Sequence, residues 1–143
     1  MLVQIYEVGS PEEARALGDL GVDHIGVLVG DGAFPREQSV QRARQIFSAI
    51  PKASKGVALL LSADVGLLER MILELKPAIV HLGASTDLLT PPAVQHLRRR
   101  CGPLTVMRSI PVQDDESVAT ARSYDGIAAV SYTHLTLPTI LRV

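Results

Sequence analysis

The sequence predicts an α/β protein built from a repeated strand–helix unit. Five times in succession a short apolar run leads into a segment with the period of an amphipathic helix, and a sixth apolar run begins at Ile127. Two of the runs, residues 57–61 and 78–82, are almost continuously apolar, as strands are when both faces of a sheet are covered. Parallel strands need helical crossovers, so this alternation indicates a parallel sheet.

Signals at the helix ends separate the units. Ser10 and Ser39 stand where N-caps are expected, and Pro11 follows Ser10 at the first helical position. Pro51 ends the second helical segment. The predicted strands cover residues 2–8, 24–29, 56–61, 78–82 and 104–110, and the last three helices are expected over residues 64–75, 90–100 and 115–124.

Composition excludes several classes of function. The 143 residues are enough for one domain, and 47% hydrophobic with 20% charged residues is typical of a folded globular chain. A net charge of −1 gives no electrostatic reason to bind nucleic acid or an acidic membrane, and 3% aromatic residues without Trp disfavour base stacking. No apolar run approaches the roughly 20 residues that span a bilayer. We therefore expect neither a nucleic-acid nor a membrane partner.

The cysteine and histidine content points to a cytoplasmic protein without a metal. Cys101 is alone and cannot form an internal disulfide, and residues 2–6 read directly as a strand rather than as a signal segment. The four His residues are far apart, with no i, i+4 pair and no partner Cys. No cofactor is expected.

Two architectures fit the repeat. The unit length suits both an open doubly wound sheet and an unfinished (β/α)8 barrel. Neither the first nor the second strand is followed by G-x-G-x-x-G, which disfavours dinucleotide binding. The repeat by itself leaves both architectures open.

A resemblance to a known family favours the barrel. Residues 3–8 read V-Q-I-Y-E-V and residues 11–14 read P-E-E-A; together they resemble the opening of phosphoribosylanthranilate isomerases, V-K-I-C-G-I-T-x-P-E-D-A. Further similar segments are residues 26–29 with 34–36 and Ser39 (G-F-V-F, S-P-R and S in the family), 56–61 (V-G-V-F-V-N), 79–83 (V-V-Q-L-H-G) and 107–112 (K-A-I-R-V). The resemblance covers about residues 2–129. It implies a partial (β/α)8 TIM barrel, with about five βα units and the start of a sixth strand.

The resemblance also implies a reaction. The family carries out the Amadori rearrangement of N-(5-phosphoribosyl)anthranilate in tryptophan biosynthesis, turning an aminoaldose phosphate into an aminoketose phosphate. It uses a Cys base at the end of strand one and an Asp acid at the end of strand six. The expected ligand is thus a small phosphorylated sugar, and the expected parent protein is an intramolecular aldose–ketose isomerase.

This sequence departs from the family at the base. Tyr6 stands at the position of the Cys, and Gln4 at that of the Lys. The period of a strand sends both side chains to the same side, into the barrel mouth. A free Tyr has a pKa near 10, so holding it as phenolate at pH 7 costs about 4 kcal/mol. Tyr6 is therefore predicted to act as a hydrogen-bonding group or an acid rather than a base, or else only to line the mouth.

Three further residues are candidates for the site or its surroundings. Arg36 follows strand two, where the resemblance implies contact with the carboxylate side of the substrate; the alternative is an exposed loop arginine. His81 stands at the family's Gln and could bind a ligand, but a satisfied interior imidazole is the favoured interpretation. Arg108 is predicted to point into the barrel, with Glu7 or Asp31 as its acidic partner.

The end of the sequence reads differently from the repeat. Residues 1–129 are interpreted as the N-terminal part of the barrel, and residues 130–143 resemble a non-native read-through tail.

Asp125 precedes the sixth strand, at the wrong end for the acid. We therefore expect this chain to be inactive alone and to self-associate through open barrel edges. The alternative function is a barrel that binds a phosphorylated ligand with a different chemistry or none.

Overall fold

Eleven helices and strands alternate along the part of the chain that the structure describes. The computed structural model describes residues 1–112 and 114–133. The elements are β1 (Gln4–Ile5), α1 (Pro11–Asp19), β2 (His24–Leu28), α2 (Val40–Ser48), β3 (Lys55–Leu60), α3 (Val65–Leu75), β4 (Ile79–Leu82), α4 (Pro91–Cys101), β5 (Thr105–Pro111), α5 (Glu116–Ser123) and β6 (Ala129–Thr133).

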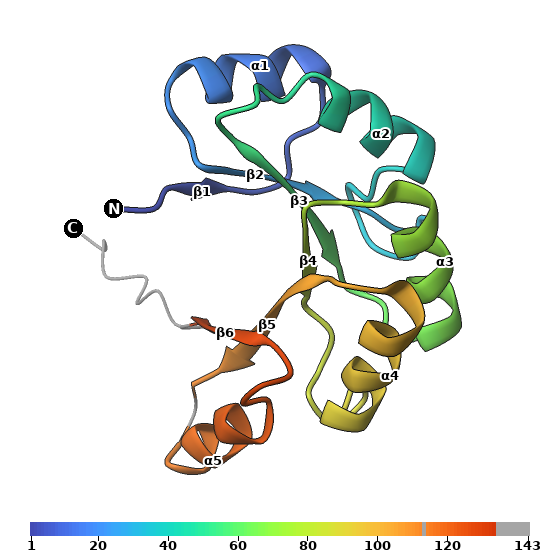
Figure 1. Ribbon diagram of the computed structural model, residues 1–143, viewed down its shortest axis with the longest axis vertical. Coiled ribbons are helices and arrows are strands. Elements are labelled where there is room, and N and C mark those ends of the chain that lie inside the picture. Colours follow the sequence, from blue (N-terminus) through green and yellow to red (C-terminus); the bar gives the residue numbers. More distant parts are fainter. Residues whose placement is uncertain (113, 134–143) are drawn as a thin grey trace, which may run out of the picture.

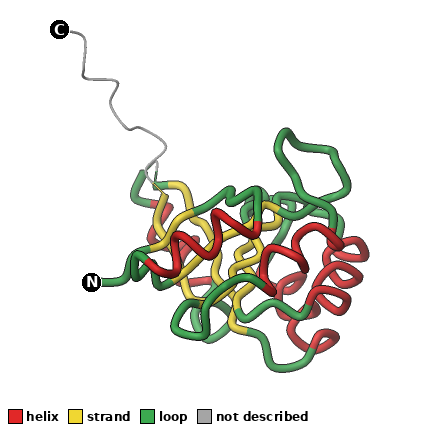
Figure 2. The backbone as a smooth tube through the Cα atoms, turned by 90° about the horizontal axis from the view of Figure 1, so that it is seen from above, coloured by secondary structure: helices red, strands yellow, loops and turns green. Residues whose placement is uncertain are grey.

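The strand order decides between the two predicted architectures. All neighbouring strands are parallel and lie in the order β1-β2-β3-β4-β5-β6, without the reversal of a doubly wound sheet. The sheet curls, with the helices on its convex side (Figure 1). Seen from above, the strands lie inside and the helices flank them (Figure 2). The fold is an α/β partial TIM barrel, as predicted.

Strand alternation creates two layers of side chains. Ile25, Ala58 and Val80 are 0–1% exposed and belong to the hydrophobic core between the sheet and the helices. Residues of the opposite parity, among them His24 and His81, face the concave side of the sheet. All four residues of β4 are buried, in agreement with its continuously apolar sequence.

The predicted helix caps are present. The Oγ of Ser10 accepts the N–H of Glu13 at 3.1 Å, and the Oγ of Ser39 accepts the N–H of Arg42 at 3.2 Å. Asp64 caps α3 through the N–H of Leu67 at 2.9 Å. Each such cap typically contributes about 1 kcal/mol to helix stability.

The first strand is shorter than the predicted 2–8. Only Gln4–Ile5 forms a regular ladder, because Glu7 has a φ of +61°, which interrupts the extended backbone. Hydrogen bonding to β2 resumes beyond it, where the N–H of Val8 donates to the carbonyl oxygen of Gly26 at 3.0 Å. The kink lies directly after Tyr6, at the carboxyl end of the strand.

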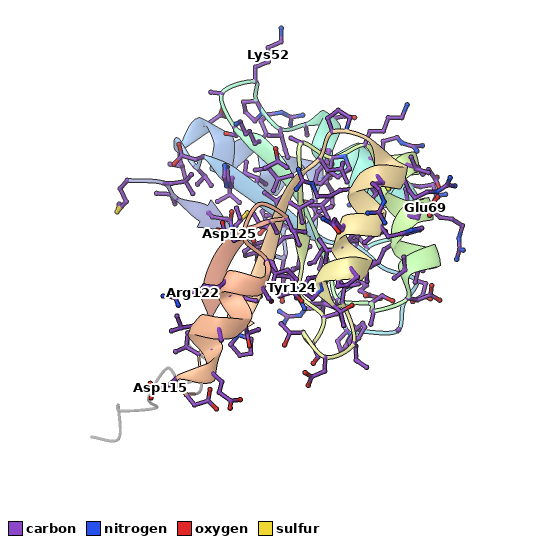
Figure 3. All side chains as sticks on the ribbon, turned by 60° about the horizontal axis from the view of Figure 1, so that its bottom comes forward. Lys52, Glu69, Asp115, Arg122, Tyr124 and Asp125 are labelled. Atoms are coloured by element: carbon purple, nitrogen blue, oxygen red, sulfur yellow. The ribbon has the colours of Figure 1, made fainter. Side chains whose placement is uncertain are left out.

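An ion pair on the outer surface joins two neighbouring helices. The Oε1 of Glu69 on α3 accepts a hydrogen bond from the Nε of Arg100 on α4 at 3.0 Å, and the Nη2 of Arg100 lies 2.9 Å from the same oxygen. Figure 3 labels Glu69 on this side of the molecule. The described residues contain no helix that is both long and apolar enough to cross a membrane.

The prediction for Arg108 is wrong. Its side chain is fully buried in the layer between the sheet and the helices, and it donates to the carbonyl oxygens of Leu82 at 2.9 Å and Leu89 at 3.4 Å. No described carboxylate lies within salt-bridge distance of it. Glu7 pairs instead with Arg36, and Asp31 accepts the N–H of Ala33 at 3.3 Å.

The sixth strand overlaps the segment that was predicted to be non-native. It begins at Ala129, two residues after the predicted start, and runs to Thr133 beside β5. Residues 134–143 lie outside the described residues. That residues 130–143 form a tail foreign to the barrel stays a prediction.

Candidate active site

A chain of hydrogen-bonded side chains crosses the concave face of the sheet. The Nε2 of Gln4 donates to the Oη of Tyr6 at 2.5 Å, and this hydroxyl is also hydrogen-bonded to the Nδ1 of His81. The Nε2 of His81 lies 2.6 Å from the Oγ of Ser109. At the other end, the Nδ1 of His24 lies 2.9 Å from the Oε1 of Gln4. Side chains from β1, β2, β4 and β5 thus meet in one array.

Strand register explains why these residues meet. Gln4 is the cross-strand partner of His24 in the β1–β2 ladder, and His81 that of Met107 in the β4–β5 ladder. Ser109 lies two residues beyond Met107 and so faces the same side.

Gly26 makes room for the tyrosine ring. A Cβ at Gly26 would lie 2.2 Å from the Cδ1 of Tyr6, closer than any real contact. The ring therefore lies directly over the backbone of β2, with its centroid 5.4 Å from that of the His81 ring. The absence of a side chain at Gly26 positions the Tyr6 hydroxyl.

Burial keeps the centre of the array uncharged. It raises the pKa of Tyr6 from 10.0 to about 12. Burial, together with the nearby positive charge of Arg108, lowers the pKa of His81 from 6.5 to about 4. At pH 7 the array therefore contains a neutral phenol and a neutral imidazole.

The proton positions in the array follow from Gln4. If its amide nitrogen donates to Tyr6, the Tyr6 O–H is left to donate to the Nδ1 of His81. The ring proton of His81 is then on Nε2 and points to Ser109. Both nitrogens of His81 have partners within the protein, and the residue is 5% exposed. This is the arrangement of a satisfied interior imidazole.

Arg36 pairs with Glu7 next to the array. Its Nη1 lies 2.5 Å from the Oε2 of Glu7, the residue after Tyr6, with the two side chains 74% and 34% exposed. Both residues have a left-handed backbone, with φ of +67° and +61°. Arg36 makes no hydrogen bond to Tyr6 or His81.

The loop before Arg36 is wrapped around one carboxylate. The Oε2 of Glu37 accepts the N–H groups of Gly32 at 2.9 Å and Phe34 at 3.2 Å. Gly30 leaves space for this carboxylate, since a Cβ there would lie 1.9 Å from its carbon atom. The conformation of the loop is therefore fixed by its own side chain.

The described residues provide no acid at the end of β6. The strand reads A-V-S-Y-T from Ala129 to Thr133. Asp115 and Asp125 lie at opposite ends of α5 in Figure 3, and Asp125 leads into β6. Asp125 is therefore at the far end of the strand from the array, as predicted. Residues 1–112 and 114–133 also contain no cluster of three or more potential metal ligands.

The curated proteins that match this chain in sequence share one name. The chain is 27% identical over 126 residues to the N-(5'-phosphoribosyl)anthranilate isomerase of Methanocella arvoryzae, covering 88% of this chain and 58% of that protein. It is 30% identical over 122 residues to the enzyme of the same name from Parvibaculum lavamentivorans, covering 85% and 54%.

In sequence and in fold, the chain is similar to phosphoribosylanthranilate isomerases. It spans somewhat more than half the length of the curated relatives it matches. A solved phosphoribosylanthranilate isomerase, in complex with reduced 1-(o-carboxyphenylamino)-1-deoxyribulose 5-phosphate, has the same fold, with a TM-score of 0.76 and 16% identity over 93% of this chain and 66% of that one. No protein-family model matches the chain.

The structure brings together three of the four predicted site residues of this phosphoribosylanthranilate isomerase-like chain. Gln4, Tyr6 and His81 share one array. Arg36 lies next to this array, because it is paired with Glu7, the residue that follows Tyr6. Ser109 was not among the predicted site residues, because its place beside His81 depends on the register of β4 and β5. The sequence interpretation also missed that Glu7 pairs with Arg36, although Glu7 replaces the glycine of the family's opening motif.

Proposed function

We propose that the protein containing this chain isomerises a phosphorylated aminoaldose to an aminoketose, as the names of its relatives indicate. The observation that carries the proposal is the sequence similarity to phosphoribosylanthranilate isomerases over 85–88% of the chain. The polar array on the concave face supports it, since a barrel reaction takes place where the strands present such side chains. The substrate would be N-(5-phosphoribosyl)anthranilate, made in tryptophan biosynthesis.

In this proposal Tyr6 is the group that meets the reacting sugar. Its raised pKa makes it a poor base at pH 7 and keeps its hydroxyl protonated. Gln4 and His81 hold its hydroxyl in place, and Arg36 provides a guanidinium for the substrate carboxylate. The general base and the acid would then come from elsewhere in the barrel.

The test is turnover by a protein that continues these residues into a complete barrel. Formation of the aminoketose phosphate is expected, with kcat reduced on Tyr6→Phe and KM raised on Arg36→Gln. Gln38→Ala serves as the control, because its side-chain amide only donates to the backbone of Arg36 at 3.3 Å. No turnover by the complete barrel would overturn the proposal.

The replacement of the family's catalytic Cys by Tyr6 favours a second function. With a neutral Tyr6 and Gln4 in the positions of the Cys and Lys, the barrel would bind a phosphorylated ligand with different chemistry or none. Calorimetry separates the two functions, because binding of the substrate without turnover would favour the second. A protein of these 143 residues alone is expected to show no isomerase activity, since β6 contributes no acid.

We also propose self-association of this chain when it is produced alone. In the described sheet, β1 and β6 each pair with a single neighbouring strand. Unpaired strand edges present free N–H and C=O groups to another chain. Light scattering after size exclusion should show a mass that rises with concentration, and a monomer at every concentration would contradict this.

A further inference from the structure

The side-chain amide of Gln4 lies between two other side chains of the array and contacts both. Its Oε1 lies 2.9 Å from the Nδ1 of His24, and its Nε2 lies 2.5 Å from the Oη of Tyr6. His24 is the cross-strand partner of Gln4 in the β1–β2 ladder, so the backbone holds these two side chains next to each other. Both ends of the amide are therefore engaged within the protein, beside the hydroxyl of Tyr6.

This orientation of the amide sets the direction of its hydrogen bonds. An amide nitrogen only donates, and an amide oxygen only accepts. The Nδ1 of His24 therefore carries a proton and donates to Oε1 of Gln4, and the oxygen of Tyr6 accepts from Nε2. A flipped amide would turn its own N–H toward the protonated Nδ1 of His24. The proton of the Tyr6 hydroxyl must consequently go to an acceptor other than Gln4.

Two proton arrangements remain between Tyr6 and His81. In the first, the O–H of Tyr6 donates to Nδ1, and the ring proton of His81 is on Nε2 and points to Ser109. In the second, Nδ1 carries the ring proton and donates to Tyr6, and the hydroxyl of Ser109 donates to Nε2. A neutral imidazole carries one ring proton, so the two arrangements exclude each other.

The pairing of donors with acceptors favours the first arrangement. A phenol is a stronger hydrogen-bond donor than the hydroxyl of a serine, and the unprotonated imidazole nitrogen is a strong acceptor. The first arrangement joins these two groups, whereas the second leaves the O–H of Tyr6 unpaired. Among the described residues, Tyr6 has no hydrogen-bonding partner except Gln4 and His81. An unpaired donor in a partly buried site costs free energy, so the first arrangement is the more stable.

We propose that Gln4 is a positioning residue: it directs the proton of Tyr6 onto His81, so that the oxygen of Tyr6 meets a ligand as a hydrogen-bond acceptor. The ligand group bound at Tyr6 is then a hydroxyl or an N–H, and an aminoaldose has both. The proposal rests on the proposed function only in taking the aminoaldose phosphate as the ligand.

The test reads the ring proton of His81 by ¹⁵N NMR of the 143-residue protein at pH 8, where this imidazole is neutral. A ring nitrogen that carries a proton has a different shift from one that does not, and His81→Gln identifies the signals of this ring. We expect the proton on Nε2 in the wild type.

Gln4→Glu keeps the shape of the side chain and replaces the donor by a second acceptor. The O–H of Tyr6 then donates to the new carboxylate, and Nδ1 of His81 has to carry the ring proton. The ratio of the Nε2–H form to the Nδ1–H form should fall at least about tenfold, the scale of one charge-assisted hydrogen bond. Ser109 stays paired, because a hydroxyl can donate as well as accept.

Two further variants separate direction from charge. Gln4→Lys places a group that only donates beside Tyr6, so the proton of His81 should stay on Nε2. Gln38→Glu makes the same chemical change as Gln4→Glu at an exposed amide that donates only to the backbone of Arg36, and it should leave the His81 signals unchanged. Preserved spectral dispersion shows that each variant is folded.

Two outcomes overturn the proposal. One is a ring proton on Nδ1 of His81 in the wild type, which needs no substitution to detect. The other is the same ring-proton position in the wild type and in folded Gln4→Glu. Failure of a complete barrel to isomerise the phosphosugar would overturn the proposed function and leave these nitrogen shifts as they are, so the two proposals fail separately. In an active barrel, Gln4→Glu should lower kcat more than Gln4→Lys does.

Discussion

The guanidinium of Arg108 lies over the ring of Tyr124, 5.4 Å from its centroid, and both side chains donate to the carbonyl oxygen of Leu89. Figure 3 shows Tyr124 pointing from the end of α5 toward α4. The cluster joins β5, the end of α5 and the loop before α4 around one acceptor. It also accounts for a fully buried cation that has no carboxylate partner among the described residues, because carbonyl dipoles and an aromatic face surround it.

The tyrosine hydroxyl of this cluster is expected to contribute measurably to stability. Tyr124→Phe removes the 2.8 Å hydrogen bond to Leu89 and leaves the longer one from Arg108. The free energy of unfolding should fall by about 1 kcal/mol, measured from urea curves with an unchanged slope. Ser123→Ala, which removes an exposed hydroxyl of the same helix, should change it by less than about 0.5 kcal/mol. Equal effects of the two substitutions would contradict the role of the cluster.

The buried imidazole predicts an acid dependence of stability. The pKa of His81 is about 4 in the folded protein, against 6.5 in the unfolded chain, so between these values the unfolded state binds more protons. The corresponding stability is fully present above pH 6.5 and is lost as the pH falls toward 4. Because side chains near the concave face retain some solvent, we expect about 1 to 2 kcal/mol rather than the full linkage value.

The measurement is urea unfolding at pH 7.5 and at pH 4.5 for the wild type and His81→Gln. Gln stands at this position in the family motif and cannot titrate. The drop in the free energy of unfolding on acidification should be smaller in the variant. An identical drop in both proteins would show that carboxylates, not His81, account for the acid sensitivity.

Most of the fold could be predicted from local sequence, and most of the site contacts could not. The caps at Ser10 and Ser39 and the apolar runs of the strands are local signals, so the elements were found within a few residues. Gln4 and Tyr6 were placed on one face by the strand period alone. The contact between His81 and Ser109 depends on the register of two strands, which no local pattern records.

Arg108 shows a limit of reasoning from charge. A charged residue on a barrel strand was expected to face the interior, but Arg108 has the parity of Val106 and Ile110, which pack against the helices. The alternation of side chains along β5 therefore determines that Arg108 points toward the helices. Its acceptors, two backbone carbonyl groups, could not be identified from side-chain patterns. The pairing of Glu7 with Arg36 likewise depends on the left-handed backbone conformation of both residues, which no sequence pattern indicates.

The phenol of Tyr6 should resist ionisation. Its pKa is raised to about 12, so the unfolded chain loses this proton from about pH 10 and the folded protein only near pH 12. The associated stability is present below pH 10 and lost as the pH rises toward 12. Absorbance of tyrosinate between pH 9 and 12, compared with that of Tyr6→Phe, isolates this residue. A Tyr6 that ionises below pH 9 would instead make it a candidate base.

The close approach of the Tyr6 ring to β2 predicts strong coupling between Tyr6 and Gly26. The Cβ of Gly26→Ala would overlap the ring, so the ring must leave its hydrogen bonds, and we expect a loss of about 1 to 3 kcal/mol in the free energy of unfolding. In a protein that already carries Tyr6→Ala, the same methyl group meets no ring, and the loss should largely disappear. Gly21→Ala is a poor control because of its φ of +84°, whereas Gly9→Ala meets only the end of the Glu13 side chain at 4.0 Å. Additive effects of Gly26→Ala and Tyr6→Ala in the double-mutant cycle would mean that the ring does not lie over Gly26.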